Sequence, residues 1–303
     1  MAGFENPDPG YMTVRQVSEY LQINEKKIYG LVNDQAIPAT RVTGKWMFPR
    51  ELVDRWMLES CHRGLLLDKL VIAGPDDPLL LRLLDSIGQQ NESRALVSHA
   101  VRATRPALDL LASGRADIAL LNWGLASQSH IRHPALLQLH GGGEWILVAG
   151  VRREIGILYR PGDPATESDI ESRLADPGYR WVRRDNVDGV WRLFIDVAVE
   201  MHLDLSNLNL VTRAAGERDA GAAIRAGVAD FAPAARATAT EFGLGFYALG
   251  EEKLDFALRR ELWFRRMFQT LLAGLRSREL HQYAEQLGGY EFENTGELLW
   301  GDR

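Results

Sequence analysis

Four side chains between positions 26 and 33 have the chemistry needed to contact a nucleic acid. Lys26 and Lys27 carry positive charge that can bind phosphate, and Tyr29 and Asn33 can reach the edges of bases. A second set of cations and donors follows a few residues later: Arg41, Thr43, Lys45 and Arg50. Because such residues also form ordinary solvated surfaces, their meaning depends on the elements that present them.

The surrounding sequence predicts two short helices joined by a turn, then a hairpin and a third helix. Thr13 and Gln16 have the spacing of a capping box, and Asn24 is a good cap for the second helix, whose apolar face includes Ile28. A turn of about three residues between two short helices is typical of a helix-turn-helix. Pro49 is expected at the first position of the third helix.

The stretch "RVTGKWMF" predicts the two strands of the hairpin around Thr43, Gly44 and Lys45. Alternate residues on one face of a hairpin usually pack against the rest of a domain. We therefore expect Trp46 and Phe48 in the core and Lys45 turned toward phosphate.

Residues 12–57 resemble the excisionase and MerR-like winged helix-turn-helix family. The resemblance rests on "TVRQVSEYL", on the lysine-bearing second helix, on the wing that ends in an aromatic residue, and on "PRELVDRW". It implies duplex DNA binding, with the second helix in the major groove and the hairpin on the backbone or minor groove. Residues 1–64 contain as many acidic as basic side chains, so binding requires a sided charge distribution and a dimer.

Composition limits the number of domains and the classes of partner that the chain can have. The 303 residues, 46% of them hydrophobic and 25% charged, are enough for two or three compact domains, and the net charge of -6 requires any nucleic-acid surface to be local. A single cysteine, Cys61, excludes an internal disulfide and a multi-cysteine metal site. The start "MAGFENPDPGYM" does not resemble a secretory signal, and the apolar runs are shorter than the roughly 20 residues of a membrane helix. We expect a cytoplasmic, soluble protein without a cofactor or metal and without a membrane partner.

From about residue 65 the pattern changes to strands that alternate with helices. "KLVIAG" is an apolar strand, "PLLLRLLDSI" a helix capped by Asp77, and "ALVSH", "RPALDLLASG" and "ADIALLN" repeat the alternation. A second set follows: "EWILVAGV" and "EIGILYRPG" as separate strands, a helix capped by Thr166, and further strand and helix pairs. The segment "KLDFALRRE" predicts a strand that returns to the first set before terminal helices. This pattern predicts an α/β fold with two lobes and a cleft.

Residues 65–300 resemble the periplasmic-binding-protein-like domain of bacterial regulators that carry an excisionase-type helix-turn-helix. The stretches that carry the resemblance are "AGPDDPLLLRLL", "ALDLLASGRADIALLN", "GILYRPGDP", "AGAAIRAGVADFAPA" and "LRSRELHQYAEQLGGYEFENTGEL". It implies a two-lobed type II binding-protein fold and a one-component transcription regulator, whose better-known members look like sensors of molybdate or tungstate. The expected domains are 1–63 for DNA binding and 64–303 for the effector, with lobe I at about 64–154 and 250–303 and lobe II at about 155–249.

Loops that follow strands should line the cleft, and they supply the candidate ligand-binding residues Asp76, Ser98, His99, Arg183, Arg184 and Asn186. Alternation at a strand end lets one of Arg183 and Arg184 face the cleft and the other face solvent. Where oxyanion-binding members carry a Gly/Ser-rich loop, this chain has "DNVDGVWR". Carboxylates in these loops repel a dianion, so a neutral or amine-bearing organic ligand is at least as good an expectation.

Three other functions remain open at this stage. Two-lobed folds host enzymes, but we expect no enzyme here and assign no catalytic residue, because no Gly-x-Ser-x-Gly, phosphate-binding Gly-rich loop or His-Glu-x-x-His motif is present. A transport binding protein would need export. An excisionase-like architectural protein would use the large domain only to dimerise.

Overall fold

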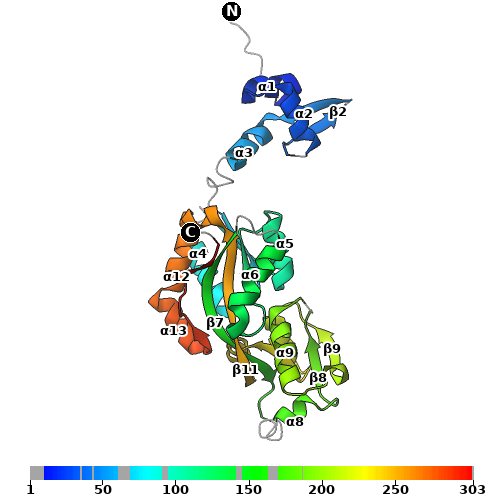
Figure 1. Cartoon of the computed structure of the whole chain (residues 1–303), viewed down its shortest axis with the longest axis vertical. Helices are drawn as coiled ribbons and strands as arrows, with labels where there is room; N and C mark the ends of the chain where they lie inside the picture. The colour runs from blue at the N-terminus through cyan, green and yellow to red at the C-terminus, as the bar shows by residue number, and fades with distance from the viewer. Residues whose placement is uncertain are drawn as a thin grey trace, which may run out of the picture. The chain divides into compact units, whose positions relative to one another are not determined.

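The computed structural model describes residues 10–34, 36–42, 44–60, 69–90, 95–140, 145–162, 170–185 and 187–301 (Figure 1). Thr43, Asn186 and Thr166 lie outside the described residues. The chain divides into two compact units, Met1–Asp68 and Lys69–Arg303. Among the described residues, no helix combines the length and the apolar character needed to cross a bilayer.

The N-terminal unit has the predicted order of helix, turn, helix, hairpin and helix. Its elements are β1 (Tyr11–Thr13), α1 (Val14–Leu21), α2 (Glu25–Asn33), β2 (Thr40–Val42), β3 (Lys45–Pro49) and α3 (Arg50–Ser60). The sequence missed β1, which pairs with β3 and makes the hairpin part of a three-stranded sheet in the order β1-β3-β2. The expected place of Pro49 was also wrong, because this residue ends β3 and pairs with Tyr11.

Local capping and a small apolar core hold this unit together. The capping box of Thr13 and Gln16 is present, and the Lys27 N–H donates to Oδ1 of Asn24 at 2.8 Å. Phe48 is fully buried, as predicted, among apolar residues of the helices. Trp46 packs against the same core but stays half-exposed.

One mixed sheet runs through the whole C-terminal unit. Its main path has the order β5-β4-β6-β11-β7-β10-β8-β9, with β12 and β13 paired to β7. The strands are β4 (Lys69–Gly74), β5 (Leu96–Val101), β6 (Ile118–Leu121), β7 (Trp145–Tyr159), β8 (Arg180–Arg183), β9 (Asn209–Arg213), β10 (Phe231–Ala235), β11 (Gly245–Arg259), β12 (Tyr290–Glu291) and β13 (Leu298–Trp300).

Strands β7 and β11 are continuous and cross between two lobes. Lobe I contains β4, β5 and β6, and lobe II contains β8, β9 and β10; the two long strands pair with each other antiparallel along their length. The prediction of separate strands "EWILVAGV" and "EIGILYRPG" was therefore wrong. The charged run between them resembles a turn in the sequence, but Arg153 is buried mid-strand among carboxylates and Glu154 pairs with Arg236.

Helices cover both faces of the sheet in lobe I. In Figure 1, α4 (Pro78–Gln90), α12 (Arg266–Leu275) and α13 (Arg278–Leu287) lie on one side of the strands, and α5 (Thr104–Ala112) and α6 (Ser129–Leu139) on the other. Each face has its own buried cluster, which explains the near-continuous apolar strands. Lobe II carries α8 (Ile170–Leu174), α9 (Gly189–Glu200), α10 (Glu217–Arg225) and α11 (Arg236–Phe242). Short 3-10 turns lie at Ala126–Gln128, Leu205–Asn207 and Arg260–Phe264.

Candidate functional site

The exposed face of α2 presents the first set of predicted contact residues. Lys26, Lys27, Tyr29 and Asn33 are all exposed, whereas Ile28 is fully buried. Tyr29 keeps 46% of its surface accessible, which is high for an aromatic side chain. The helix therefore divides into one side that packs on the domain and another that carries two cations and two groups able to form hydrogen bonds.

Gly30 is half-buried, lies at helical spacing between Lys26 and Asn33, and was not singled out from the sequence. Glycine inside a helix costs about 1 kcal/mol relative to alanine. A Cβ added at Gly30 would meet nothing within 4 Å, so packing inside the protein does not require a glycine there. The absence of a side chain leaves the helix backbone open between Lys26 and Asn33, where a partner can approach closely.

The wing presents its cations in two different ways. Lys45 is exposed at the start of β3, next to Gly44 with its φ of 84°. Arg41 lies opposite Trp46 in the sheet, and its guanidinium sits 5.7 Å from the centre of the indole ring, covering part of that ring. Lys45 is thus directed to solvent, while Arg41 is also exposed but rests on the domain.

Arg50 is held against the first helix. Its guanidinium lies 5.0 Å from the centre of the Tyr20 ring, and the Tyr20 hydroxyl donates to Asp54 at 2.7 Å. This cluster joins α1 to α3.

Asp76, the first candidate in the C-terminal unit, bridges the two lobes. The backbone N–H groups of Glu217 and Arg218 donate to its two carboxylate oxygens at 2.6 and 3.1 Å. These groups open α10, whose N-cap Gly216 supplies no side-chain cap of its own. A Cβ at Gly216 would lie 2.3 Å from Asp76 Oδ2, so the close approach requires glycine. The carboxylate from lobe I therefore serves as the cap of a lobe II helix.

Beside it, Arg153 forms a buried ion network that the sequence did not reveal. Its guanidinium, 1% exposed, lies 2.9 Å from Asp77 and 2.6 Å from each of Glu217 and Glu252. These partners come from the loop before α4, from α10 and from β11. As predicted, Asp77 caps α4, since the Leu80 N–H donates to its Oδ1 at 2.9 Å. Its other oxygen binds Arg153, so one carboxylate combines the two roles.

Neutral groups complete the network. Asn122 donates to Glu252 at 3.2 Å, and the Thr104 hydroxyl donates to Asn122 Oδ1 at 2.8 Å. The Tyr290 hydroxyl donates to Asp77 at 2.8 Å. Nearly every charged oxygen that lies between the lobes is therefore bound to a donor.

Burial shifts the proton affinities of this network. Desolvation raises the pKa of Glu252 to about 7; Arg153 opposes the shift and the charge of Glu217 adds to it. The pKa of Glu217 is raised as well, by the same desolvation against the attraction of Arg153 and Arg184. Five carboxylates are buried here with two guanidinium groups: Asp76, Asp77, Asp188, Glu217 and Glu252 with Arg153 and Arg184.

Arg183 and Arg184 face opposite ways, as the alternation predicted. Arg183 is exposed, whereas Arg184 is 1% exposed and binds both oxygens of Asp188 at 3.1 and 2.6 Å. Desolvation acts to lower the pKa of Arg184, but Asp188 outweighs it and the pKa is raised. Asp188 also caps α9, accepting from the Trp191 N–H at 3.0 Å. Arg184 Nη1 is buried with no hydrogen-bond partner among the described residues.

The two predicted ligand-binding residues on β5 also differ in exposure. Ser98 is exposed and His99 is half-buried, as alternate residues of a strand require. Desolvation lowers the pKa of His99, although the charges of Asp76 and Asp77 oppose the shift. Nε2 of His99 is buried and has no partner within the described part of the chain. Among the described residues, no group of three His, Cys, Asp or Glu side chains has the arrangement of a metal site.

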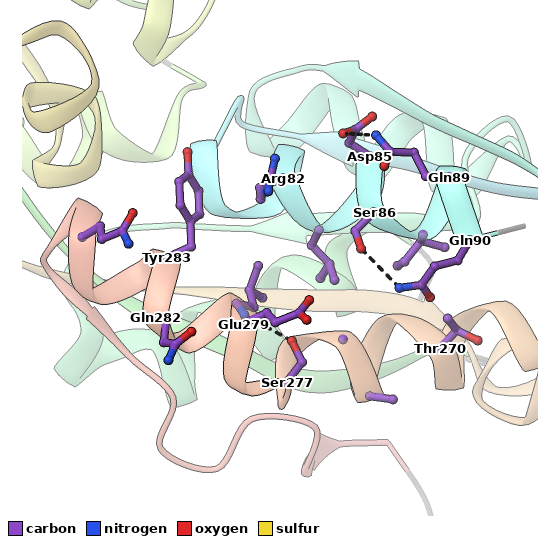
Figure 2. A pocket seen from close by; sticks show the side chains of 16 residues that line it. Arg82, Asp85, Ser86, Gln89, Gln90, Thr270, Ser277, Glu279, Gln282 and Tyr283 are labelled. Atoms are coloured by element: carbon purple, nitrogen blue, oxygen red, sulfur yellow. Dashed lines mark hydrogen bonds between the residues drawn. The ribbon is translucent and has the colours of Figure 1, made fainter.

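A groove of about 670 Å³ lies elsewhere, between α4, α12 and α13 (Figure 2). Polar side chains dominate its rim, and Gln90 donates to Ser86 within it at 3.3 Å. The described residues that line it include none of the predicted ligand-binding residues. The groove therefore lies away from the charged groups that join the lobes.

Residues 86–276 match the PBP superfamily domain, and residues 11–60 match a helix-turn-helix domain. The chain belongs to the PBP superfamily. Its PBP domain follows a DNA-binding type of domain, as the sequence predicted, in a mixed α/β fold. No curated protein sequence matches the chain.

Solved structures share the fold of the PBP domain at low sequence identity. A mutant of OxyR from Corynebacterium glutamicum with bound hydrogen peroxide is 13% identical, with 91% of this chain and 89% of that chain covered and a TM-score of 0.54. PEB3 with bound L-phospholactate is 17% identical, covering 73% and 99%, with a TM-score of 0.50. The regulatory domain of MetR, a LysR-family regulator from N. meningitidis, is 13% identical, covering 74% and 97%, also at 0.50. The domains thus resemble those of regulators and binding proteins rather than enzymes.

Proposed function

We propose that this protein is a ligand-responsive transcription regulator that binds duplex DNA through residues 11–60 and a small molecule between the lobes of its PBP domain. The supporting observation is the presence on one chain of a helix-turn-helix domain with an exposed cationic α2 face and a two-lobed PBP domain. We place the protein in the cytoplasm, where it meets DNA, and expect it to act as a homodimer.

In the proposed complex, α2 enters the major groove. Its residues Lys26 and Lys27 bind phosphates, and Tyr29 and Asn33 contact base edges. Lys45, with Thr43 and Arg41, binds the backbone from the wing. One such domain binds few phosphates, so two copies on adjacent half-sites are needed for useful affinity.

The response to ligand would pass through the two crossing strands. Because β7 and β11 are the long strands that run from lobe I into lobe II, bending within them changes the separation of the lobes. In a dimer, such closure changes the spacing of the two DNA-binding domains. An effector would thereby alter operator affinity in either direction.

DNA binding can be tested with the full chain by selection from a random duplex pool, followed by titration at several salt concentrations. Replacing Lys26 and Lys27 by alanine should weaken binding to all sequences and reduce the slope of log affinity against log salt by about 0.9 for each phosphate that the variant no longer neutralises. Arg15→Ala is the matched control, because Arg15 is an exposed cation of the same domain that lies on α1 and pairs with Glu19. Equal effects of the two changes would remove α2 from the interface.

Ligand response can be tested separately by a thermal-shift screen with small acids, amines and oxyanions, including molybdate and tungstate. A compound that raises the melting temperature should then change operator affinity at fixed salt. Unchanged affinity in the presence of a bound compound would favour an architectural protein whose PBP domain only dimerises.

A further inference from the structure

The first turn of α10 binds a carboxylate in the way that a helix N-terminus binds an anionic ligand. Two consecutive backbone N–H groups, of Glu217 and Arg218, point at the two oxygens of Asp76. The carboxylate comes from the other lobe, 141 positions away from Glu217 in the chain. Gly216 clears the space for it.

An arginine with an unpartnered nitrogen follows the strand that ends near the start of this helix. Arg184 is almost completely buried and directly follows Arg183, whose carbonyl accepts from the Ala214 N–H at 3.0 Å, two residues before the N-cap Gly216. Its Nη1 has no hydrogen-bond partner among the described residues. A buried guanidinium nitrogen without an acceptor is rare, because leaving a donor unsatisfied is costly. The arrangement therefore provides one more donor than Asp76 uses.

We propose that the N-terminus of α10, together with Arg184, is a binding site for a singly charged carboxylate ligand, and that Asp76 occupies this site when the ligand is absent. The proposal rests on the proposed function, since it names the effector class and the resting state of the same cleft. His99, whose Nε2 also lacks a partner in the described part of the chain, lies on β5, which pairs with β4, the strand that leads to Asp76.

Charge decides between a carboxylate and a doubly charged oxyanion. The buried groups here already comprise five carboxylates and two guanidinium groups. A monocarboxylate that displaces Asp76 exchanges one negative charge for another. A sulfate or molybdate dianion would add a further negative charge beside Glu217 and Asp188, and burial magnifies that repulsion. An amine would find the carboxylates already bound to donors.

Displacement of Asp76 would change contacts in both lobes. Asp76 adjoins Asp77, which caps α4 in lobe I and binds Arg153. Removing Asp76 from α10 therefore breaks one of the interactions that join the lobes, directly beside the residue that caps α4. In this way a ligand that uses the site would alter lobe separation.

Chemical rescue of the full-length Asp76→Ala variant tests the proposal. Hydrogen exchange of peptides that cover residues 214–225 should be about tenfold faster or more in the variant, because the amides lose a charged acceptor. Sodium acetate should restore protection in a saturable manner and raise the melting temperature. Sodium chloride, sodium sulfate and methylammonium chloride at equal ionic strength should not do so.

Acetate that protects the variant no better than chloride, or sulfate that protects it better than acetate, would overturn the carboxylate site. If Asp76→Ala does not fold, Gly216→Ala provides the test, since its Cβ would displace Asp76 and also block acetate. That variant should exchange faster in residues 214–225 without rescue by acetate; wild-type exchange would overturn the proposal. Neither readout involves DNA, so a chain that fails to bind DNA would refute the proposed function and leave this test intact.

Discussion

Replacing Arg153 by methionine should destabilise the PBP domain strongly. The substitution keeps most of the apolar stem but removes the only guanidinium that binds Asp77, Glu217 and Glu252 together in the described network. Removing one partner of a buried ion pair costs about 3–5 kcal/mol, because the remaining charges stay buried without compensation. A change of 1 kcal/mol shifts the melting temperature of a domain of this size by about 2–4 °C. The expected loss is therefore roughly 6–20 °C.

Arg152→Met is the matched control, because Arg152 is the adjacent residue on the same strand. Its side chain is 30% exposed and pairs with Glu251 at 3.1 Å and with Glu291. Half-exposed pairs of this kind contribute at most about 1 kcal/mol. Calorimetry of both full-length variants in one buffer should separate the buried pair network from the surface pair.

The loss caused by Arg153→Met should also depend on pH. Arg153 holds down the pKa of Glu252, which desolvation raises to about 7, so its removal raises that pKa further. At pH 5.5 the unpaired carboxylates bind protons at little cost and escape part of the penalty, whereas at pH 8 binding a proton or staying charged costs more free energy. An equal loss at the two pH values, or a loss no larger than that of Arg152→Met, would refute the interpretation of Arg153 as the compensating charge.

Three further predictions concern single residues. Glu252→Gln should flatten the pH dependence of the unfolding free energy, measured in urea, between pH 5 and 8. The raised pKa of Glu252 contributes its full stabilisation only below the pKa that this group has in the unfolded chain. That contribution is lost as the pH rises through about 7. Gly30→Ala should raise the unfolding free energy of the N-terminal unit by up to about 1 kcal/mol and yet weaken DNA binding; tighter binding would show that the backbone there is not approached. Asn24→Ala should destabilise that unit by about 1 kcal/mol through loss of the α2 cap. Asn24→Asp should retain most of the stability, and thermal melts of both variants measure the difference.

Features that depend on neighbours in the chain were predictable from the sequence. Thr13, Asn24 and Asp77 cap helices as expected, because each cap joins a side chain to an amide three positions later. The alternation of strands and helices predicted the α/β fold for the same reason, since apolar periodicity reflects local geometry. The exposed side of α2 also followed from helical spacing once Ile28 was assigned to the core.

The continuous course of β7 and the buried Arg153 were not predictable in this way. The runs around Arg153 and Glu252 did contain a signal, since charged residues interrupt strands that are otherwise apolar. That signal was interpreted as a break between strands, because charges are rarely buried without partners. Their partners lie far away in the chain.

By itself, the sequence determined the helix-turn-helix order, the two-lobed α/β fold, the helix caps and the solvent-facing residues of α2, all of which depend on spacing over a few residues. Only the tertiary structure decided that Asp76 caps α10, that Arg153 gathers carboxylates from both lobes, and that Arg184 rather than Arg183 is buried. The physical reason is that the energy of a buried charge depends on which distant charges the fold brings beside it, and those distances do not exist until the lobes pack together.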